Sequence, residues 1–470
     1  MHHANKIQKL FAIYLKFRGL SAKAFNTLHA LAITMSHKWT ADHVVKMSKA
    51  SMKEVTRQMQ VYPWLISYDN INIPFCVFSQ RLNNKDTFGS GAAATVYIKR
   101  HAKPLMADIN HELQACRAVG IKNPLSALDI LDIGQKAELW ICDHTIYHIL
   151  QFLLDAPEFA LHSYQHWDDT LLCPPNPVHA LPHGPEHVTL QYLLGSLNIP
   201  EVSYADNERL VDQWLHQLGI DTPEARQQLS QNKVITWVGD QLTVDRLCGL
   251  FKFRSEDVNT FDRLDWMVLA FGWLHLQMVF ANSLYQQYLG TTSGKGVMHA
   301  YTLLQRKGLA GMSTRGPFHH DLEELLYHMA EAHIRLAWTT VGEVQELSQL
   351  RAKTPPELIA LAERIVTDHA SSAALVRMQN QPESKRDEVR EQTVMWNRDA
   401  LQYIVLDHAI KHGDVGLIED FLPSLLYRFI GGRNSKYAIE VLELLQGLHR
   451  EWPPAVRYMF LLSHSIAPLM

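Results

Sequence analysis

Two short apolar runs, each stopped by an aspartate, constrain the fold of this chain more than any other feature. Residues 64–68 read WLISY and are followed by Asp69, while residues 234–239 read VITWVG and are followed by Asp240. Short runs rich in aromatic and β-branched residues are typical of buried strands, and α/β folds place their chemistry where such strands end. The runs therefore predict a sheet that presents Asp69 and Asp240 at the carboxyl ends of two strands.

Most of the remaining chain has the apolar spacing of helices. Apolar residues recur every three or four positions up to about residue 60, from 104 to 155, and from 303 to the end. That spacing is typical of amphipathic helices. Residues 266–271 fit either a strand or the first turns of a long apolar helix. The predicted fold class is therefore an α-rich α/β protein.

Two further strands are predicted after Asp69. Residues 75–78 and 94–98 are short and apolar, and the polar stretch 83–86 between them is typical of a turn. We therefore expect three consecutive short strands in this region, of which the second and third form a hairpin.

Composition limits the classes of protein. The chain has 470 residues, 47% apolar and 20% charged, which is enough for two or more packed units. Its five scattered cysteines include no C-x-x-C pair, which favours reduced thiols in an intracellular compartment. The longest apolar stretch, 266–281, is interrupted and falls short of the roughly 20 residues that span a bilayer, so no membrane partner is expected.

The net charge of −4 bears on any role with nucleic acid. Proteins that bind nucleic acid usually carry an excess of basic residues, and none is visible over the whole chain. DNA binding would therefore have to depend on a local basic patch or on a bound metal ion.

The paired aspartates predict a specific chemistry. Neighbouring carboxylates bind Mg²⁺ or Mn²⁺, and two such ions clamp the attacking and leaving oxygens of a phosphodiester. Asp69 and Asp240 are the candidate metal ligands. The alternative is that each aspartate forms a turn through hydrogen bonds to the backbone that follows it.

A second metal pattern is weaker. Cys142, His144 and His148 have a spacing that places the two histidines one helical turn apart, which is compatible with zinc. No second cysteine pair lies nearby, and 26 histidines make such a spacing common by chance.

Several longer motifs resemble a large family of unknown function that is expanded in mushroom-forming fungi. The resemblance covers most of the chain. Its motifs are 68–75 (YDNINIPF), 79–82 (SQRL), 239–243 (GDQLT) with Arg246, 273–278 (WLHLQM) and 432–440 (GRNSKYAIE).

The order of these segments is more distantly similar to cut-and-paste transposases of the hAT and Mutator-like kinds. Those enzymes have a ribonuclease-H-like fold and an Asp-Asp-Glu metal site. The resemblance implies that Asp69 and Asp240 are the two aspartates and that His275 is the histidine that follows the second one. Those families usually carry cysteine or aspartate three residues before this histidine, whereas this chain has Gly272.

The third acid has more than one candidate. Glu440 follows the break at 431–434, where the resemblance implies a late glutamate, although its helical phase beside Glu443 also fits an ordinary solvated face. Glu323 and Glu324 are rivals, and acids in a first helical turn are expected from the helix dipole alone.

These observations predict a ribonuclease-H-like mixed sheet interrupted by large helical insertions. The expected parts are a helical N-terminal region (1–60), the first core strands (61–103), a helical insertion (104–232), the second part of the core (233–290), a further helical insertion (291–430) and C-terminal helices that close the core (431–470).

The predicted function is a transposon-derived, Mg²⁺- or Mn²⁺-dependent DNA nuclease or transposase-like core, with Asp69, Asp240 and Glu440 as catalytic residues. It would be a nuclear protein, capable of forming a homo-oligomer, and either an active enzyme or a decayed or truncated copy of one. The alternative is a non-catalytic, mostly helical interaction protein.

Overall fold

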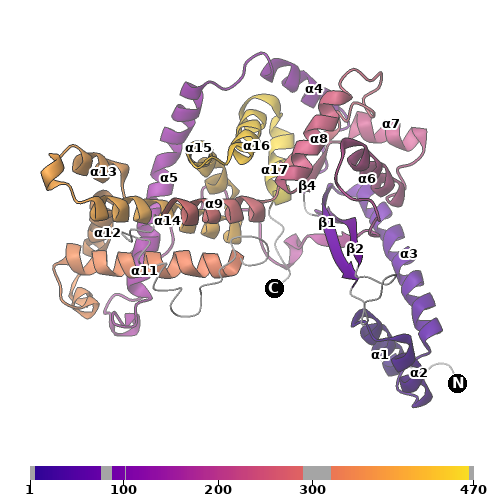
Figure 1. Cartoon of the computed structure of the whole chain (residues 1–470), viewed down its shortest axis with the longest axis horizontal. Coiled ribbons are helices and arrows are strands. Elements are labelled where there is room, and N and C mark those ends of the chain that lie inside the picture. The colour runs from indigo at the N-terminus through magenta and orange to yellow at the C-terminus, as the bar shows by residue number, and fades with distance from the viewer. Residues whose placement is uncertain (1–5, 76–86, 101, 289–318, 465–470) are drawn as a thin grey trace. The chain divides into compact units, whose positions relative to one another are not determined.

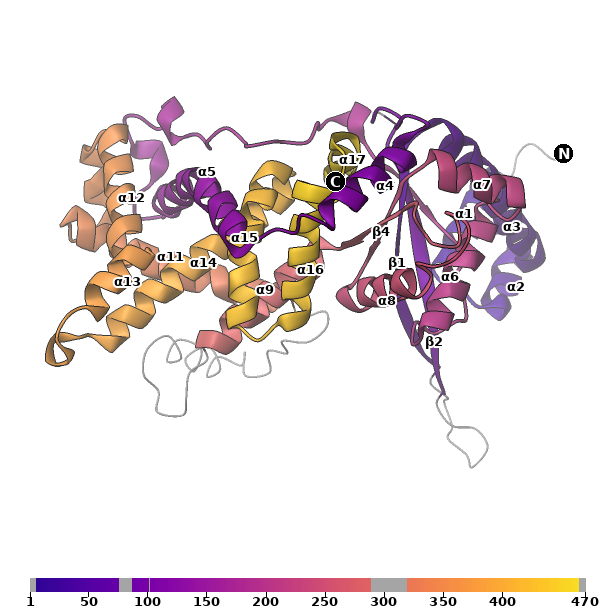
Figure 2. The same ribbon diagram turned by 90° about the horizontal axis from the view of Figure 1, so that it is seen from above.

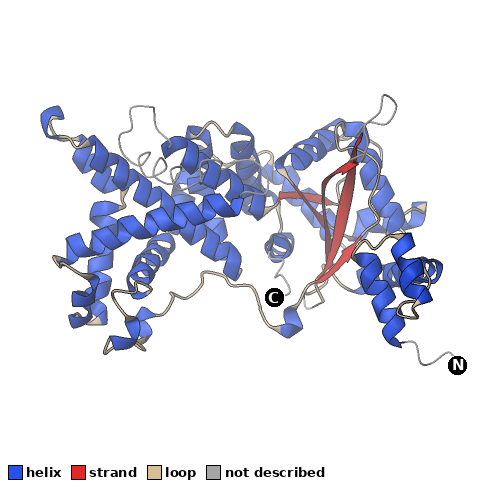
Figure 3. Cartoon of the chain, turned by 60° about the horizontal axis from the view of Figure 1, so that its bottom comes forward, coloured by secondary structure: helices blue, strands red, loops and turns tan. Residues whose placement is uncertain are grey.

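The computed structural model describes residues 6–75, 87–100, 102–288 and 319–464. The chain has an α/β fold that is mostly helical, and its five strands form one mixed sheet in the order β3-β2-β1-β4-β5 (Figure 3). It divides into two compact units, each built from segments that are remote in sequence. The first unit comprises 1–106, 189–235 and 249–266, and the second comprises 107–188, 236–248 and 267–470.

Three helices open the first unit. They are α1 (Lys6–Phe17), α2 (Ala22–Ala30) and α3 (His37–Val61) (Figure 1). The side chains of Ser21 and Ser36 accept hydrogen bonds from backbone N–H groups of α2 and α3, respectively. Serine at these positions satisfies N–H groups that have no partner within the helix, which is why the helices begin there. The prediction that this region is helical is confirmed.

A long antiparallel hairpin follows, and it differs from the three short strands predicted. Strand β1 (Trp64–Phe75) pairs over its whole length with β2 (Thr87–Ile98). The prediction that the first strand stops at Tyr68 was wrong, because the alternating residues 69–73 suit a strand with one polar face. Of the predicted strand at 75–78, Phe75 ends β1 and the rest lies outside the described residues.

The first unit also contains a strand that the sequence reading missed. Strand β3 (Leu190–Leu193) pairs antiparallel with residues 95–98 of β2, within a stretch predicted to be helical. Two helices follow it, α6 (Tyr204–Gln217) and α7 (Pro223–Asn232). Helix α6 begins with a capping box in which Ser203 and Asp206 bind each other's backbone N–H groups.

The second unit begins with α4 (Ile109–Gly120) and α5 (Ala127–Leu154). Strand β4 (Ile235–Gly239) and helix α8 (Gln241–Phe253) lie where a strand and a short helix were predicted. Residues 266–271, which fitted either element, form strand β5 (Met267–Phe271) and are followed by α9 (Trp273–Tyr288).

The remaining elements of this unit are helical, as predicted. They are α11 (His319–Gly342), α12 (Pro355–His369), α13 (Ser372–Gln379), α14 (Glu388–His412), α15 (Val415–Gly431), α16 (Ser435–Gln446) and α17 (Pro454–His464). Helix α5 packs with α12, α14 and α15, and α11 packs with α12 and α14 (Figure 2). The buried core between α5, α11 and α12 includes Trp338, Leu350 and Ile365. No helix of the described residues has the length and apolar character needed to cross a membrane.

Candidate functional site

Asp240 occupies the turn between β4 and α8. One of its carboxylate oxygens, Oδ1, accepts a hydrogen bond of 2.7 Å from the backbone N–H of Thr243. The preceding residue is Gly239, and a Cβ atom there would lie 2.3 Å from the Thr243 side chain, so any larger residue would force a shift. The half-buried carboxylate of Asp240 is thus held at the end of a strand, as predicted, and it also performs the capping role of the alternative reading.

His275 lies close to the same strand end. The N–H of Gly272, just after β5, donates to the carbonyl of Gly239 at 3.0 Å. His275 lies in the first turn of α9, and its imidazole is next to Gly272. A Cβ atom built on Gly272 would lie 3.5 Å from Nδ1 of His275. The sequence linked His275 to Asp240 only through the resemblance to transposases. In the structure, the ends of β4 and β5 lie side by side and bring these two residues into one region of the second unit.

Glu440 is buried, with 7% of its surface exposed. The reading that placed it on a solvated face was wrong, whereas its neighbour Glu443 is exposed. The amide Nε2 of Gln241, the residue after Asp240, lies 3.4 Å from Glu440 Oε1 and donates to it. A buried carboxylate requires partners of this kind, so Glu440 is held against the start of α8.

Tyr437 lies near both Asp240 and Glu440. Burial is the main cause that raises the pKa of its hydroxyl above the ordinary value, and the negative charges of Asp240 and Glu440 raise it further. The ring packs between Phe271 and Phe429, at centroid distances of 6.3 and 5.9 Å. Sequence reasoning did not assign Tyr437 a role. The available signal was its position three residues before Glu440, which puts both side chains on one face of α16.

The second unit therefore gathers Asp240, Glu440, Gln241 and Tyr437, with His275 at the neighbouring strand end. Among the described residues, no group of three or more histidine, cysteine, aspartate or glutamate side chains is placed to hold a metal ion. Mg²⁺ usually takes one or two carboxylates and completes its octahedron with water and substrate phosphate oxygens, so Asp240 and Glu440 are the residues of this region that could supply ligands to such an ion.

Asp69 belongs to the first unit and is not at a strand end. It lies in the middle of β1, opposite Ala93 of β2, and its side chain is exposed. Its Oδ1 accepts from the backbone N–H of Asn70 at 2.7 Å. The expectation that Asp69 closes its strand was therefore wrong, and so was the alternative that it forms a turn.

Glu323 and Glu324, the rival candidates for the third acid, lie on α11. Glu323 forms an ion pair of 2.5 Å with Lys411 of α14, and Lys411 also binds Asp407 at 2.8 Å. Glu324 is exposed. These contacts join α11 to α14 and bring neither acid to Asp240.

Four histidines form a separate cluster on α5 and α14. The rings of His148 and His408 lie 4.8 Å apart, and those of His408 and His412 lie 3.9 Å apart. Both ring nitrogens of buried His144, and Nε2 of His148, have no hydrogen-bond partner within the described part of the chain. The zinc spacing noted in the sequence thus meets a second histidine pair from another helix, although these side chains are not placed to hold a metal ion.

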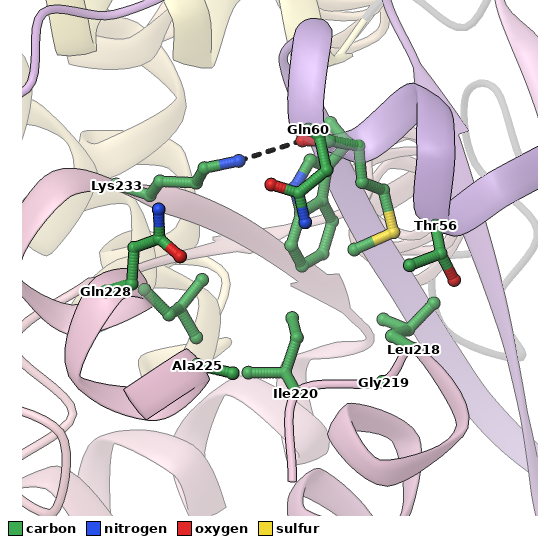
Figure 4. A pocket seen from close by; sticks show the side chains of 11 residues that line it. Thr56, Gln60, Leu218, Gly219, Ile220, Ala225, Gln228 and Lys233 are labelled. Atoms are coloured by element: carbon green, nitrogen blue, oxygen red, sulfur yellow. Dashed lines mark hydrogen bonds between the residues drawn. The ribbon is translucent and has the colours of Figure 1, made fainter. Parts of the chain in front are cut away.

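A small pocket in the first unit is lined mostly by α3, α7 and the connection between α6 and α7 (Figure 4). Lys233 Nζ donates to the carbonyl of Met59 at 2.8 Å, and burial lowers the pKa of Lys233. Carboxylates and histidines are absent from the described residues that line this pocket.

The sequence profile of a family of unknown function, DUF6589, matches residues 120–466. No curated protein and no solved structure is significantly similar to the chain.

Proposed function

Since the chain belongs to DUF6589, a family of unknown function, its activity has to be inferred from its own residues, and we propose that it is a transposon-derived, metal-dependent DNA nuclease or transposase core. The observation that carries the proposal is the pairing of Asp240 and Glu440. They lie 200 residues apart in sequence, and the negative charges of both raise the pKa of Tyr437. Gln241, which follows Asp240 at the end of β4, donates a hydrogen bond to Glu440.

The order of the strands supports the fold in this proposal. Strands β1, β2 and β3 are antiparallel neighbours, and the order β3-β2-β1-β4-β5 is compatible with a ribonuclease-H-like sheet. In this scheme the second carboxylate follows β4, where Asp240 lies.

Asp240 and Glu440 would hold the divalent ion. When bound, Mg²⁺ or Mn²⁺ neutralises charge that develops on phosphodiester oxygens and activates water or a 3′-hydroxyl. The protein groups around it have positioning roles: Gln241 orients Glu440, and the Tyr437 hydroxyl stays protonated and can donate a hydrogen bond to an anionic oxygen.

The test is cleavage of supercoiled plasmid DNA by the full-length chain with Mn²⁺ or Mg²⁺, against an EDTA control. Asp240→Asn and Glu440→Gln are expected to remove metal-dependent cleavage. Each substitution keeps the shape of the side chain but removes the negative charge of the carboxylate that would bind the metal ion. Glu443→Gln is the matched control, since Glu443 is exposed on the same helix.

Binding of Mn²⁺ alone, measured by calorimetry, separates the site from the reaction. Weaker Mn²⁺ binding by Asp240→Asn and Glu440→Gln, with Glu443→Gln unchanged, is the expected result. A folded wild type that neither cleaves DNA nor binds Mn²⁺ would overturn the proposal.

One observation favours the alternative of a non-catalytic interaction protein. Helix α1 exposes Ile7, Leu10 and Phe17 by 72%, 69% and 70%, and these residues lie along one stripe. Exposed apolar stripes are typical of protein-binding surfaces, and a homo-oligomer formed through α1 is the simplest form of this proposal. Light scattering of wild type and Leu10→Glu tests it, because an oligomer that depends on α1 dissociates in the variant.

Nuclear localisation, which the DNA substrate implies, is tested by imaging a tagged chain.

A further inference from the structure

A polar cavity of about 890 Å³ lies in the second unit, and none of the acids discussed above lines it. Its walls come from the C-terminal half of α9, from the start of α13, from α14, from the C-terminal half of α15 and from the connection between α15 and α16. Residues that face it include Gln286, Arg398, Gln402, Arg428, Arg433 and Asn434.

The charge of this cavity is positive. Three arginines line it, whereas Asp399 is the single acid among the described lining residues. Asp399 is fully buried and satisfied, because it accepts hydrogen bonds from Arg428 at 2.7 and 2.9 Å and from Arg398 at 2.8 Å. Asp399 therefore holds two guanidinium groups in fixed positions, and it neutralises only one of the three positive charges.

Arg433 supplies a donor that nothing in its surroundings uses. It is exposed, and within the described part of the chain its guanidinium makes no hydrogen bond or ion pair. Its backbone has φ of +59°, a left-handed conformation that costs a non-glycine residue about 1 kcal/mol or more. Arg433 therefore adds a positive charge to the lining of the cavity.

The start of α16 adds further donors. The N-cap residue Asn434 makes no side-chain capping bond. The first N–H groups of a helix have no partner within it, and the helix dipole favours an anion there. Planar guanidinium groups beside free N–H groups suit a phosphate group, which accepts several hydrogen bonds at once.

We propose that this arginine cavity binds a backbone phosphate of the nucleic-acid strand on which the Asp240–Glu440 site acts. The inference rests on the proposed function and names a contact for its substrate. Helix α16 connects the two places, because Glu440 follows Ser435 by five residues, about 7.5 Å along the helix axis. A strand with one phosphate in the cavity would thus lie near the carboxylates.

The test is the affinity of the full-length chain for a fluorescent single-stranded DNA oligonucleotide, measured by anisotropy in EDTA over a range of KCl concentrations. Two exposed residues on different walls are changed. Arg433→Gln removes a cation and keeps the same backbone strain, while Gln286→Glu adds an anion on α9. Lys136→Gln is the control, since it removes an exposed charge from α5 outside the cavity.

Both cavity variants are expected to bind DNA several-fold more weakly than wild type. For Arg433→Gln, the slope of log K against log[KCl] should also fall by about 0.7, the value for one lost phosphate contact on a single strand. Lys136→Gln should match wild type. Equal affinities and slopes for wild type and both variants would overturn the inference, as would wild type that does not bind DNA.

Two further arms separate the possible explanations. Inorganic phosphate alone, in calorimetry, should bind far more weakly than the oligonucleotide; tighter binding would assign the cavity to free phosphate and overturn the nucleic-acid source. Binding without any cleavage would refute the proposed catalysis and leave this inference standing, whereas metal-dependent cleavage with unaffected cavity variants would refute this inference alone.

Discussion

Replacing Asp399 by asparagine should destabilise the second unit strongly. The carboxylate is fully buried and accepts bonds from Arg398, Arg428 and the hydroxyl of Tyr288, the last at 2.6 Å. The substituted side chain keeps the volume but loses the charge and places an NH₂ group against donors. Removing one partner of a buried ion pair costs about 3–5 kcal/mol, so the folded-to-unfolded ratio should fall by more than about 100-fold.

The measurement is urea denaturation followed by tryptophan fluorescence. The matched control is Asp368→Asn, which breaks the exposed ion pair of 3.0 Å between Asp368 and Arg377. Exposed pairs contribute about 0–1 kcal/mol, so this control should unfold close to wild type. A loss below about 1 kcal/mol for Asp399→Asn would refute the claim that Asp399 organises the two arginines.

The pH dependence gives a second check on the same residue. Burial would raise the pKa of Asp399, but hydrogen bonds and charges of Arg428 and Arg398 outweigh it and lower the pKa below its ordinary value. A carboxyl with a lowered folded-state pKa contributes its full stability above about pH 4 and loses it as the pH falls through the folded-state value. The difference between wild type and Asp399→Asn should therefore shrink below about pH 4, and a constant difference would contradict the reasoning.

Three other perturbations follow from local contacts. Asp414→Ala leaves the backbone N–H groups of Val178, His179 and Leu417 without their acceptor and should cost about 2–4 kcal/mol in urea denaturation. Burial lowers the pKa of His148 to about 3 and that of His408 to about 4. As the pH drops below about 6.5, these histidines become protonated in the unfolded chain but not in the folded chain, so the free energy of unfolding should fall. His148→Gln should flatten this acid dependence by up to about 1.4 kcal/mol per pH unit, and an unchanged profile would contradict it. Gly239→Ala places a Cβ atom against the fully buried Thr243 and should cost about 1–3 kcal/mol, seen as a lower melting temperature.

Local sequence was sufficient for most helices. Ser21, Ser36 and Ser203 precede helical stretches and cap them in the structure. Capping and apolar spacing act within a few residues, so the sequence shows them directly. The same holds for β4 and α8, which meet at Asp240 where the reading placed them.

Pairing between distant segments was beyond local reasoning. The four residues of β3 become a strand because they pair with β2, about 95 residues earlier. Polar residues after Tyr68 were read as the end of a strand, yet β1 continues because β2 pairs with it up to Phe75. A strand obtains its hydrogen bonds from another segment, whereas a helix makes its own.

The sequence alone determined the candidate acids, because a carboxylate after a short apolar run or near the start of a helix is visible in one stretch of chain. It could not determine which of them meet. Tertiary packing buries Glu440 against Gln241 and brings Tyr437 close enough to Asp240 and Glu440 for their charges to raise its pKa. It also pairs Glu323 with Lys411 on another helix. A site made of residues 200 positions apart exists only when helices and strands pack, since the free energy that holds a buried carboxylate comes from partners on other elements.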